Sequence, residues 1–274
     1  MQKFLFKKEN RYKKRIPVLM YHEVSEIPES KMEVRRMHPT YSLSVQQFEE
    51  QMEYLFKNNY KSISLSSLFN KENSYEKGVV ITFDDGFVGN YKYALPVLKK
   101  YNFTATIFII VSQVSSEGYL NWQQLSELSR NGISIQSHTM THQPTGQLTD
   151  EELFYELSES KKIIEDKLGQ AINFVSLPHG SFHKNLVNIA REIGYSGICS
   201  STFEYVRPKE IQYTAGRIPI KSRHRIEDFR QIVSENKMRI FKYKLFLFIT
   251  NGLVKIIGLN NYRKIYRFIF RIKL

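Results

Sequence analysis

Short β-prone runs alternate with segments of helical periodicity along this chain of 274 residues, and no other feature restricts its fold as strongly. The clearest runs, residues 79–83 and 105–111, are separated by a helical pattern. Further along, Thr149 and Glu152 form a predicted capping box for a long helix that ends near Gly169. Such alternation is typical of βα units around a parallel sheet or barrel. The sequence therefore predicts an α/β fold.

The other predicted elements continue the same alternation. Further strands are expected at 16–21, 133–136, 174–177, 197–200 and 218–220, and further helices at 45–56, 93–101, 122–131, 186–193 and 226–233. Ile63 and Leu65 indicate one more short strand, and residues 23–43 are expected to be irregular. In folds of this kind the chemistry collects on the loops that follow the strands, so we look for a site there.

Most of the formal net charge of +13 lies at the two ends of the chain. Residues 1–15 carry +6 and residues 236–274 carry +10, which leaves the body, 16–235, slightly negative. A nucleic-acid enzyme usually places Lys and Arg around its working groove, and this body lacks such a cluster, so we expect no nucleic-acid partner. The single Cys199 excludes a disulfide framework and a cysteine-based zinc ribbon. We expect three parts: a basic N-terminal segment, a barrel domain and a basic helical tail, with these boundaries.

The tail predicts contact with a membrane surface but no membrane span. Its most apolar window, 245–257, is shorter than the about 20 residues that a spanning helix needs. Within 262–272, apolar residues recur at helical spacing while arginines recur every four residues on another face, the pattern of a basic amphipathic helix. Two interpretations stay open: peripheral contact of 236–274 with anionic lipid, or a helix pair, 240–258 and 261–273, packed on the barrel.

The start of the chain adds a prediction about location. Residues 1–15 contain no apolar stretch like that of a secretory signal. Without a signal or a spanning helix, we expect a cytoplasmic protein that contacts the inner face of the membrane through its tail, or does not contact it at all. Solvated basic ends are the simpler interpretation of the N-terminal charge.

Asp84 and Asp85 follow the most β-prone strand of the chain. Two adjacent carboxylates repel each other, so their placement at one strand end is costly unless a cation or a division of roles compensates. Gly86 would let the chain bend so that both side chains reach one site. The alternative is that the pair caps the following helix.

His138 and His142 follow another strand, in the run His-Thr-Met-Thr-His. On a helical turn, residues four apart lie on the same face, so both imidazoles could bind one ion. Two polar loop histidines are the alternative. Taken with the aspartates, the pair predicts a three-ligand site that leaves positions for water and substrate.

A third segment, Ser176–Gly180, closes a strand with the sequence Ser-Leu-Pro-His-Gly. A Pro-x-Gly turn can present a backbone N–H to a developing oxyanion. By itself the segment is equally typical of an ordinary turn.

These motifs, in this order, resemble the polysaccharide deacetylase family, also called the NodB-homology domain or carbohydrate esterase family 4. The resemblance rests on Thr82–Gly86, His138–His142 and Leu177–Gly180, supported by Val18–His22 and Ala215–Ile218. It covers about residues 16–233. It implies a distorted (β/α)7 TIM-like barrel that binds one divalent metal ion, with zinc as the expected ion. The basic amphipathic tail lies outside the resemblance.

The resemblance also implies residue roles. Asp85, His138 and His142 match the family's metal ligands, and Asp84 matches its catalytic base. The backbone of His179 matches the oxyanion donor, at a position where the family more often has Tyr.

The remaining expected contacts lie on two loops. Pro178 and Gly180 flank the turn that would face the substrate, and His22 follows the first strand of the barrel. We assign these three residues to substrate binding.

Two departures from the family pattern are visible. Many members have Arg where this chain has Ser176, and we expect Arg217 to pair with Asp84 from a neighbouring strand instead. No clear copy of the late histidine segment that supplies the general acid is present. His22, His179 and His224 are the candidates for that role, and the choice stays open.

The expected activity is metal-dependent hydrolysis of N-acetyl groups on a glycan. The expected location favours an N-acetylated sugar, polysaccharide or lipid-linked glycan precursor as substrate. A metal-dependent amidohydrolase acting on a non-sugar amide is one alternative. A catalytically silent glycan-binding protein of the same fold is the other.

Overall fold

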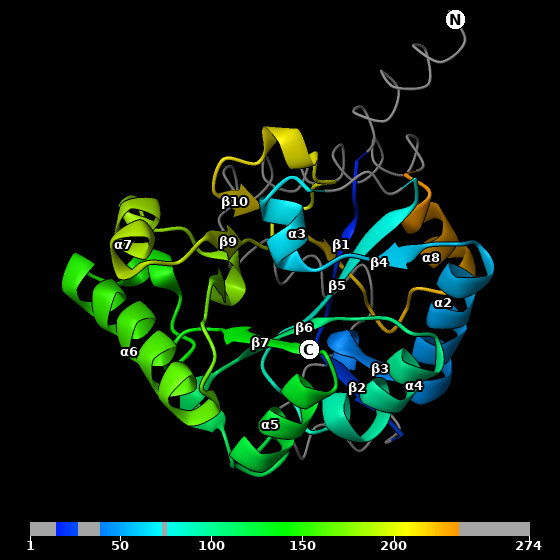
Figure 1. The fold of residues 1–274 in the computed structure, drawn as a ribbon, viewed down its shortest axis with the longest axis horizontal. Helices are drawn as coiled ribbons and strands as arrows, with labels where there is room; N and C mark the ends of the chain where they lie inside the picture. The colour runs from blue at the N-terminus through cyan, green and yellow to red at the C-terminus, as the bar shows by residue number, and fades with distance from the viewer. Residues whose placement is uncertain (1–14, 27–38, 73–75, 236–274) are drawn as a thin grey trace, which may run out of the picture. The chain divides into compact units, whose positions relative to one another are not determined.

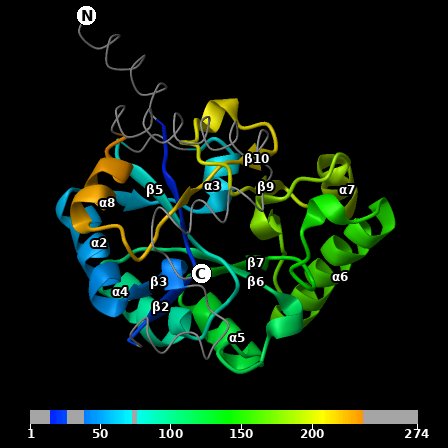
Figure 2. The same cartoon turned by 180° about the vertical axis from the view of Figure 1, so that it is seen from behind.

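A sheet of parallel strands with helices around it forms the centre of the protein (Figures 1 and 2). The structure, a computed structural model, describes residues 15–26, 39–72 and 76–235. The strands are β1 (Val18–Tyr21), β2 (Glu23–Ser25), β3 (Ser42–Ser44), β4 (Lys61–Ser62), β5 (Gly78–Phe83), β6 (Thr106–Ile109), β7 (Ser134–Ser137), β8 (Phe174–Ser176), β9 (Gly197–Cys199), β10 (Thr214–Ala215) and β11 (Ile218–Pro219).

The order of the strands shows that the sheet wraps around on itself. Along the sheet the order is β10-β9-β8-β7-β6-β5-β1-β11, with β4 paired to β5, and every pairing is parallel. The two outer strands, β10 and β11, are separated in sequence only by Gly216 and Arg217. The chain can span no more than about 11 Å from Ala215 to Ile218, so the two edges of the sheet lie close together. The predicted distorted (β/α)7 barrel is confirmed, with β10 and β11 as the two halves of its last strand.

The helices connect the strands and cover the outside of the sheet. They are α2 (Val45–Lys57), α3 (Leu65–Phe69), α4 (Leu95–Lys100), α5 (Trp122–Arg130), α6 (Asp150–Leu168), α7 (Leu186–Ile193) and α8 (Ile226–Val233). A π-helical turn, Asn90–Ala94, precedes α4. The capping box that the sequence predicted for Thr149 and Glu152 is present. Ser44 caps α2 in the same way, because its side chain accepts from the Gln47 N–H.

Most buried side chains of the barrel are apolar, and β5 is buried along its whole length. Val18, Val80 and Phe108 on three of the strands belong to one core cluster with residues of α3 and the last strands. Phe69 at the end of α3 packs on Phe174 with ring centroids 5.1 Å apart. The core thus extends from the barrel strands to the short helix α3.

Two predictions about local structure were wrong. The short strand near Ile63 is Lys61–Ser62, and Leu65 instead begins α3, because the Ser64 side chain caps that helix. Within 23–43, expected to be irregular, β2 and β3 form a separate parallel pair. These strands are three residues long, too short to show an alternating pattern.

Of the three predicted parts of the chain, the described residues belong mainly to the barrel domain. The tail at 236–274, with its expected amphipathic helix and helix pair, and residues 1–14 lie outside the described residues, so the three-part division stays a prediction. Among the described residues, no helix has the length and apolar character needed to span a membrane.

We predict that Gly197→Ala destabilises the fold by about 1–3 kcal/mol, the usual cost of overpacking a core. An added Cβ at Gly197 would lie 2.2 Å from Cε1 of Phe69, so the ring would have to move away from Phe174. Chemical denaturation of Gly197→Ala, Phe69→Ala and the double variant measures the effect. The losses of unfolding free energy in the two single variants should add to more than the loss in the double variant. Strict additivity would show that contact with the Phe69 ring is not what makes a larger residue unfavourable at position 197.

Candidate active site

The two aspartates at the end of β5 reach the same site because the backbone turns sharply after Asp84. Asp85 has φ 71° and Gly86 has φ 79°, so two successive residues adopt the left-handed conformation. Gly86 permits this freely, whereas Asp85 is one of the few side chains that tolerate it. Asp84 is 3% exposed, and Asp85 lies closer to the surface. The strained position of Asp85 is typical of a functional residue.

His138 and His142 follow β7 on an irregular loop rather than on a helical turn. Thr139 (φ 67°) and His142 (φ 64°) both adopt left-handed conformations, and these two bends bring the rings together. The ring centroids are 4.7 Å apart. The expectation that the pair shares a site is met, but the helical geometry considered in the sequence analysis is wrong.

Three side-chain atoms converge where these segments meet. Nε2 of His138 and Nε2 of His142 lie 3.4 and 3.5 Å from Oδ1 of Asp85. One ligand atom from each of the three residues lies within 4.8 Å of the other two, and this is the one such group found in the described part of the chain. Asp85 Oδ1 is buried and has no hydrogen-bond partner there. A buried carboxylate oxygen facing two imidazoles fits a divalent cation.

The protonation of the two rings agrees with a ligand role. Nδ1 of His138 lies 2.9 Å from the Ser176 carbonyl oxygen. A carbonyl only accepts, so Nδ1 carries a proton, and in the neutral ring Nε2 keeps a lone pair directed at the site. Burial lowers the pKa of His138, but the charges of Asp84 and Asp85 outweigh it and raise the pKa, so a cation bound at Nε2 would compete with a proton there. Burial and the neighbouring His138 lower the pKa of His142 to about 4. His142 is therefore neutral near pH 7, the form that binds metal.

Arg217 is the largest fully buried side chain among the described residues, and it pairs with Asp84. Nη1 and Nη2 each donate to one oxygen of the carboxylate at 2.7 Å. The three other N–H groups donate to the Ser200 carbonyl, to Thr82 Oγ1 and to Ser176 Oγ. All five donors of the guanidinium are thus satisfied. The expected contact with Asp84 is present, and Ser176 takes part in it.

This ion pair determines the protonation of Asp84. Burial alone would raise the pKa of Asp84, but the charges of Arg217 and then His138 hold it well below its usual range. Asp84 is therefore an ionised carboxylate at neutral pH, with its oxygens held by Arg217. Oδ2 of Asp84 lies 3.9 Å from Nε2 of His138, which places the second carboxylate beside the convergent triad.

The last strand of the barrel is interrupted between β10 and β11, and at this break the Arg217 side chain turns into the barrel. The Arg217 N–H donates to the Thr202 carbonyl instead of to the sheet. A Cβ at Gly216 would lie 2.7 Å from the same carbonyl oxygen, so only glycine allows this close approach. The residues between β10 and β11 thus turn one side chain into the barrel interior.

The predicted oxyanion turn lies beside the triad. Pro178–Gly180 forms a 3₁₀ turn after β8, in which His179 has φ 56° and ψ 11°. The His179 N–H has no acceptor among the described residues, whereas the N–H groups of Gly180 and Ser181 are bonded within the turn. The exposed His179 ring lies against His142, with centroids 4.8 Å apart. The turn thus contacts the convergent residues through the His179 and His142 rings.

His22 lies at the edge of the same site. Its ring stacks on Tyr41 with centroids 4.6 Å apart, and its Nδ1 is shielded from solvent without a hydrogen-bond partner among the described residues. Burial lowers the pKa of His22 below its usual value, and the carboxylates of Asp85 and Asp84 offset only part of this shift, so the ring lies within electrostatic range of both. His224 lies on the loop after β11, where its Nδ1 accepts the Lys221 N–H.

Glu156 on α6 holds the histidine loop and was missed by the sequence analysis. Its Oε2 accepts the N–H groups of Met140 (2.9 Å) and Thr141 (2.8 Å), and its Oε1 accepts the Thr141 hydroxyl. The side chain is 4% exposed. A signal was present in the sequence: Glu156 is the acidic residue in an otherwise uncharged buried stripe of α6, between Leu153 and Ser160.

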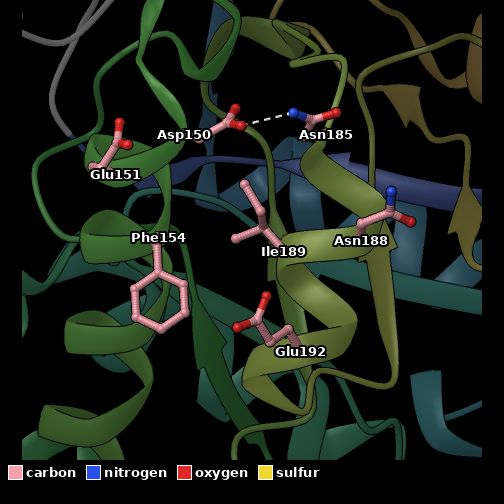
Figure 3. Close-up of a pocket in the computed structure, with 7 residues that line it drawn as sticks. All are labelled: Asp150, Glu151, Phe154, Asn185, Asn188, Ile189 and Glu192. Carbon is pink, nitrogen blue, oxygen red and sulfur yellow. Dashed lines mark hydrogen bonds between the residues drawn. The ribbon is translucent and has the colours of Figure 1, made fainter.

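A separate pocket lies between α6 and α7 and contains none of the predicted site residues (Figure 3). Three carboxylates and the apolar side chains of Phe154 and Ile189 line it, and Asn185 donates to Asp150 at 2.8 Å. Figure 3 shows side chains from the start of α6 facing those of α7. The predicted site residues described above lie instead on the loops after β5, β7 and β8, at the end of β1 and in the split last strand.

Comparisons with known proteins identify relatives of the chain. Residues 71–198 match the polysaccharide deacetylase family. YxkH of Bacillus subtilis, whose name assigns it to the polysaccharide deacetylases, is 35% identical over 186 residues, which are 66% of this chain and 62% of the relative. The poly-β-1,6-N-acetyl-D-glucosamine N-deacetylase of Staphylococcus aureus is 26% identical over 197 residues, 66% of this chain and 68% of the relative.

A solved structure agrees with the fold. The deacetylase PplD of Streptococcus pyogenes, determined in complex with acetate, superposes with a TM-score of 0.72 at 25% identity. The match covers 80% of this chain and 98% of PplD.

We predict that Asp84→Asn lowers the unfolding free energy of the metal-free protein by about 3–5 kcal/mol, because it leaves the Arg217 charge buried without a counter-charge. The lowered pKa of Asp84 also gives a sign for pH dependence. Its stabilising contribution is complete above the unfolded pKa of about 3.9 and is lost as pH falls below it.

Chemical denaturation in EDTA between pH 2 and pH 7 measures both effects. The wild type should lose stability in acid more steeply than Asp84→Asn, and the double variant Asp84→Asn/Arg217→Met should recover part of the loss. Equal stability and equal slopes for wild type and Asp84→Asn would contradict the role of the pair in the fold.

We predict that Glu156→Gln weakens the affinity of the Asp85–His138–His142 group for an added divalent ion, with Zn²⁺ as the probe, about 10–100-fold, the usual effect of removing a supporting contact around a metal site. The glutamine amide can place only one acceptor oxygen where the carboxylate accepts three donors. Competition with a chromophoric chelator measures the affinity, below the unfolding temperature of each variant. Glu159→Gln removes the same charge from the same helix and should bind like the wild type; equal affinities for all three proteins would refute the prediction.

Proposed function

We propose that this chain, which matches the polysaccharide deacetylase family over residues 71–198, is a metal-dependent hydrolase that removes N-acetyl groups from a glycan. The observation that carries the proposal is the convergence of Asp85, His138 and His142 beside an ionised Asp84. The matched segment spans 62% of the Bacillus subtilis relative, so the activity, substrate and partners of this chain are proposed here on its own residues.

The proposed metal ligands are Asp85, His138 and His142, with zinc as the favoured ion. Two imidazoles and one carboxylate form a donor set that catalytic zinc sites use, and three protein ligands leave room for water and substrate. A divalent ion bound there supplies a Lewis acid that polarises the amide carbonyl and lowers the pKa of a water molecule.

Asp84 is the proposed base. Its carboxylate accepts one proton from the attacking water as the oxygen–carbon bond forms, and Arg217 keeps both carboxylate oxygens in place before the reaction. The His179 N–H donates to the carbonyl oxygen as negative charge develops there. Pro178 and Gly180 hold this N–H in its left-handed turn. The carbon–nitrogen bond then breaks, and acetate and an amine leave.

The leaving nitrogen needs a proton, and His22 is the proposed donor. Of the three histidines considered, His22 has a shielded Nδ1 with no partner among the described residues. Burial lowers the pKa of His22, and the charges of Asp85 and Asp84 offset part of that shift. His179 is exposed and His224 is engaged in the loop after β11. In this arrangement one side of the amide faces the base and the other faces the acid.

The proposed substrates are glycans that contain N-acetylglucosamine. The Staphylococcus aureus relative is named for that sugar polymer, and PplD was solved with acetate, the other product of the proposed reaction. A lipid-linked precursor and contact of the tail with an anionic membrane remain parts of the proposal that rest on the sequence alone. A non-sugar amide as substrate, or a silent glycan-binding protein, are the competing functions.

Acetate release from N-acetylglucosamine oligomers tests the proposal. The purified full chain should release acetate, lose the activity in EDTA and regain it with Zn²⁺. Asp84→Asn and His142→Ala should each lower kcat at least about 100-fold, the lower end of the effect of a positioned proton-transfer group.

The competing functions give different results in the same assay. A silent binding protein would bind the oligomers without releasing acetate, and a non-sugar amidohydrolase would release acetate only from other N-acetyl amides. His22→Ala should remove the basic limb of the pH profile of kcat, whereas His224→Ala should keep it. A basic limb that survives in His22→Ala and is lost in His224→Ala would overturn the assignment of the acid.

A further inference from the structure

A short basic loop, residues 221–225, follows β11 and has no role in the proposed chemistry. It contains Lys221, Arg223 and Arg225 within five residues. The sequence analysis found no basic cluster around a groove in the body of the chain. The structure places this run at the end of the barrel where the candidate site lies, because β11 is parallel to the strands that carry the site residues.

The register of the sheet places Lys221 beside His22. Met20 of β1 is paired with Pro219 of β11, and the Ile220 N–H donates to the Met20 carbonyl at 2.9 Å. Continuing this register by two residues brings Lys221 level with His22. The loop after β11 therefore borders the proposed general acid.

Contacts between side chains connect the same residues. The Nζ atom of Lys221 lies 5.6 Å from the ring centroid of Tyr41, and the Tyr41 ring is stacked on His22 with centroids 4.6 Å apart. Together these two distances place the ammonium group of Lys221 no farther from the His22 ring than about the length of two sugar rings. Lys221 thus lies within reach of a substrate bound at the site.

The loop is held in place by backbone contacts. The Ser222 N–H donates to the Thr40 carbonyl at 2.9 Å, and Gln47 Nε2 on α2 donates to the Ser222 carbonyl at 2.8 Å. The segment between the two cations is therefore anchored from both sides. A preformed position costs less conformational entropy on binding than a free surface lysine would.

Within the described residues, Lys221 and Arg223 have no carboxylate partner. Among the described residues, no Asp or Glu oxygen lies within 4.0 Å of Lys221 Nζ or of the Arg223 guanidinium. Burial lowers the pKa of Lys221, and the nearby charge of Arg223 lowers it further, with no acid opposing the shift. On the following helix, Asp228 accepts the Arg225 N–H at 3.2 Å. Lys221 is half-buried and Arg223 is exposed. A half-buried cation is normally paired, so within the described part of the chain Lys221 and the neighbouring Arg223 lack a counter-ion.

We propose that Lys221 and Arg223 bind an oxyanion of the substrate, so that the preferred glycan carries a phosphate or carboxylate group next to the N-acetylated sugar. This inference rests on the proposed function, because it takes His22 and the triad as the place of the amide. A planar guanidinium and an ammonium group are the donors that recognise phosphate and carboxylate oxygens. The Tyr41 ring stabilises the ammonium charge while the site is empty of substrate.

Three matched disaccharides test the inference. They are di-N-acetylchitobiose, its 1-phosphate, and the corresponding disaccharide with glucuronic acid in place of the reducing sugar. For the wild type, kcat/KM should be at least about ten times higher on one of the two anionic compounds than on the neutral one, the effect of hydrogen bonds to a charged group. A preference for the 1-phosphate indicates recognition of phosphate, and a preference for the glucuronic acid compound indicates recognition of carboxylate.

The variants are Lys221→Met, which keeps the apolar stem, and Arg223→Gln. Each should reduce the ratio of anionic to neutral kcat/KM about tenfold, mainly through KM, and 0.5 M NaCl should reduce the ratio for the wild type. Lys162→Met removes an exposed charge from the outer helix α6 and should keep the wild-type ratio. A ratio near one for the wild type, or an unchanged ratio in both variants, would overturn the inference.

Failure of the proposed function gives a different result. In that case the wild type releases acetate from none of the three compounds. Calorimetric binding of the de-N-acetylated disaccharide with and without the 1-phosphate needs no turnover and still decides the inference. Tighter binding of the phosphorylated compound that is lost in Lys221→Met supports the oxyanion site, and equal binding of the two compounds rejects it.

Discussion

The buried ion pair between Arg217 and Asp84 is the interaction on which the rest of the site depends. A guanidinium at 0% exposure is tolerated because all five of its N–H groups are satisfied, two of them by one carboxylate. To bring Arg217 inside, the last strand divides into β10 and β11, which form the two edges of the curved sheet. The ion pair also keeps Asp84 ionised, so this one contact connects the position of the last strand with the chemistry proposed for the site.

Much of this arrangement could be predicted where the signal is local. Helix α6 runs from Asp150 to Leu168 as expected, because the Thr149 cap and the Gly169 stop act within a few residues. Contacts between distant segments gave weaker signals. Strand β2 pairs with β3, and Glu156 accepts hydrogen bonds from the loop that carries the two histidines. Both contacts join chain segments that only the folded structure brings together. The left-handed Asp85 was not anticipated either, because the flexible Gly86 alone was expected to supply the bend.

The site has two sides with different chemistry. On one side, β5, β7 and β8 supply the carboxylates, imidazoles and backbone donor proposed to act on the amide. On the other, β1 and β11 supply His22 and the basic loop, linked through the Tyr41 ring. Glu156 supports the first side from α6, and Gln47 supports the second from α2. The barrel thus places proposed catalysis and proposed recognition on neighbouring strands.

The central claim is that one divalent ion is held by Asp85, His138 and His142. A crystal of the full chain soaked in zinc, with diffraction data collected above and below the zinc absorption edge, tests it directly. The account predicts an anomalous peak between the carboxylate of Asp85 and the Nε2 atoms of the two histidines, and loss of that peak in His142→Ala. Zinc bound elsewhere, or these three side chains turned away from one another with no peak between them, would contradict it.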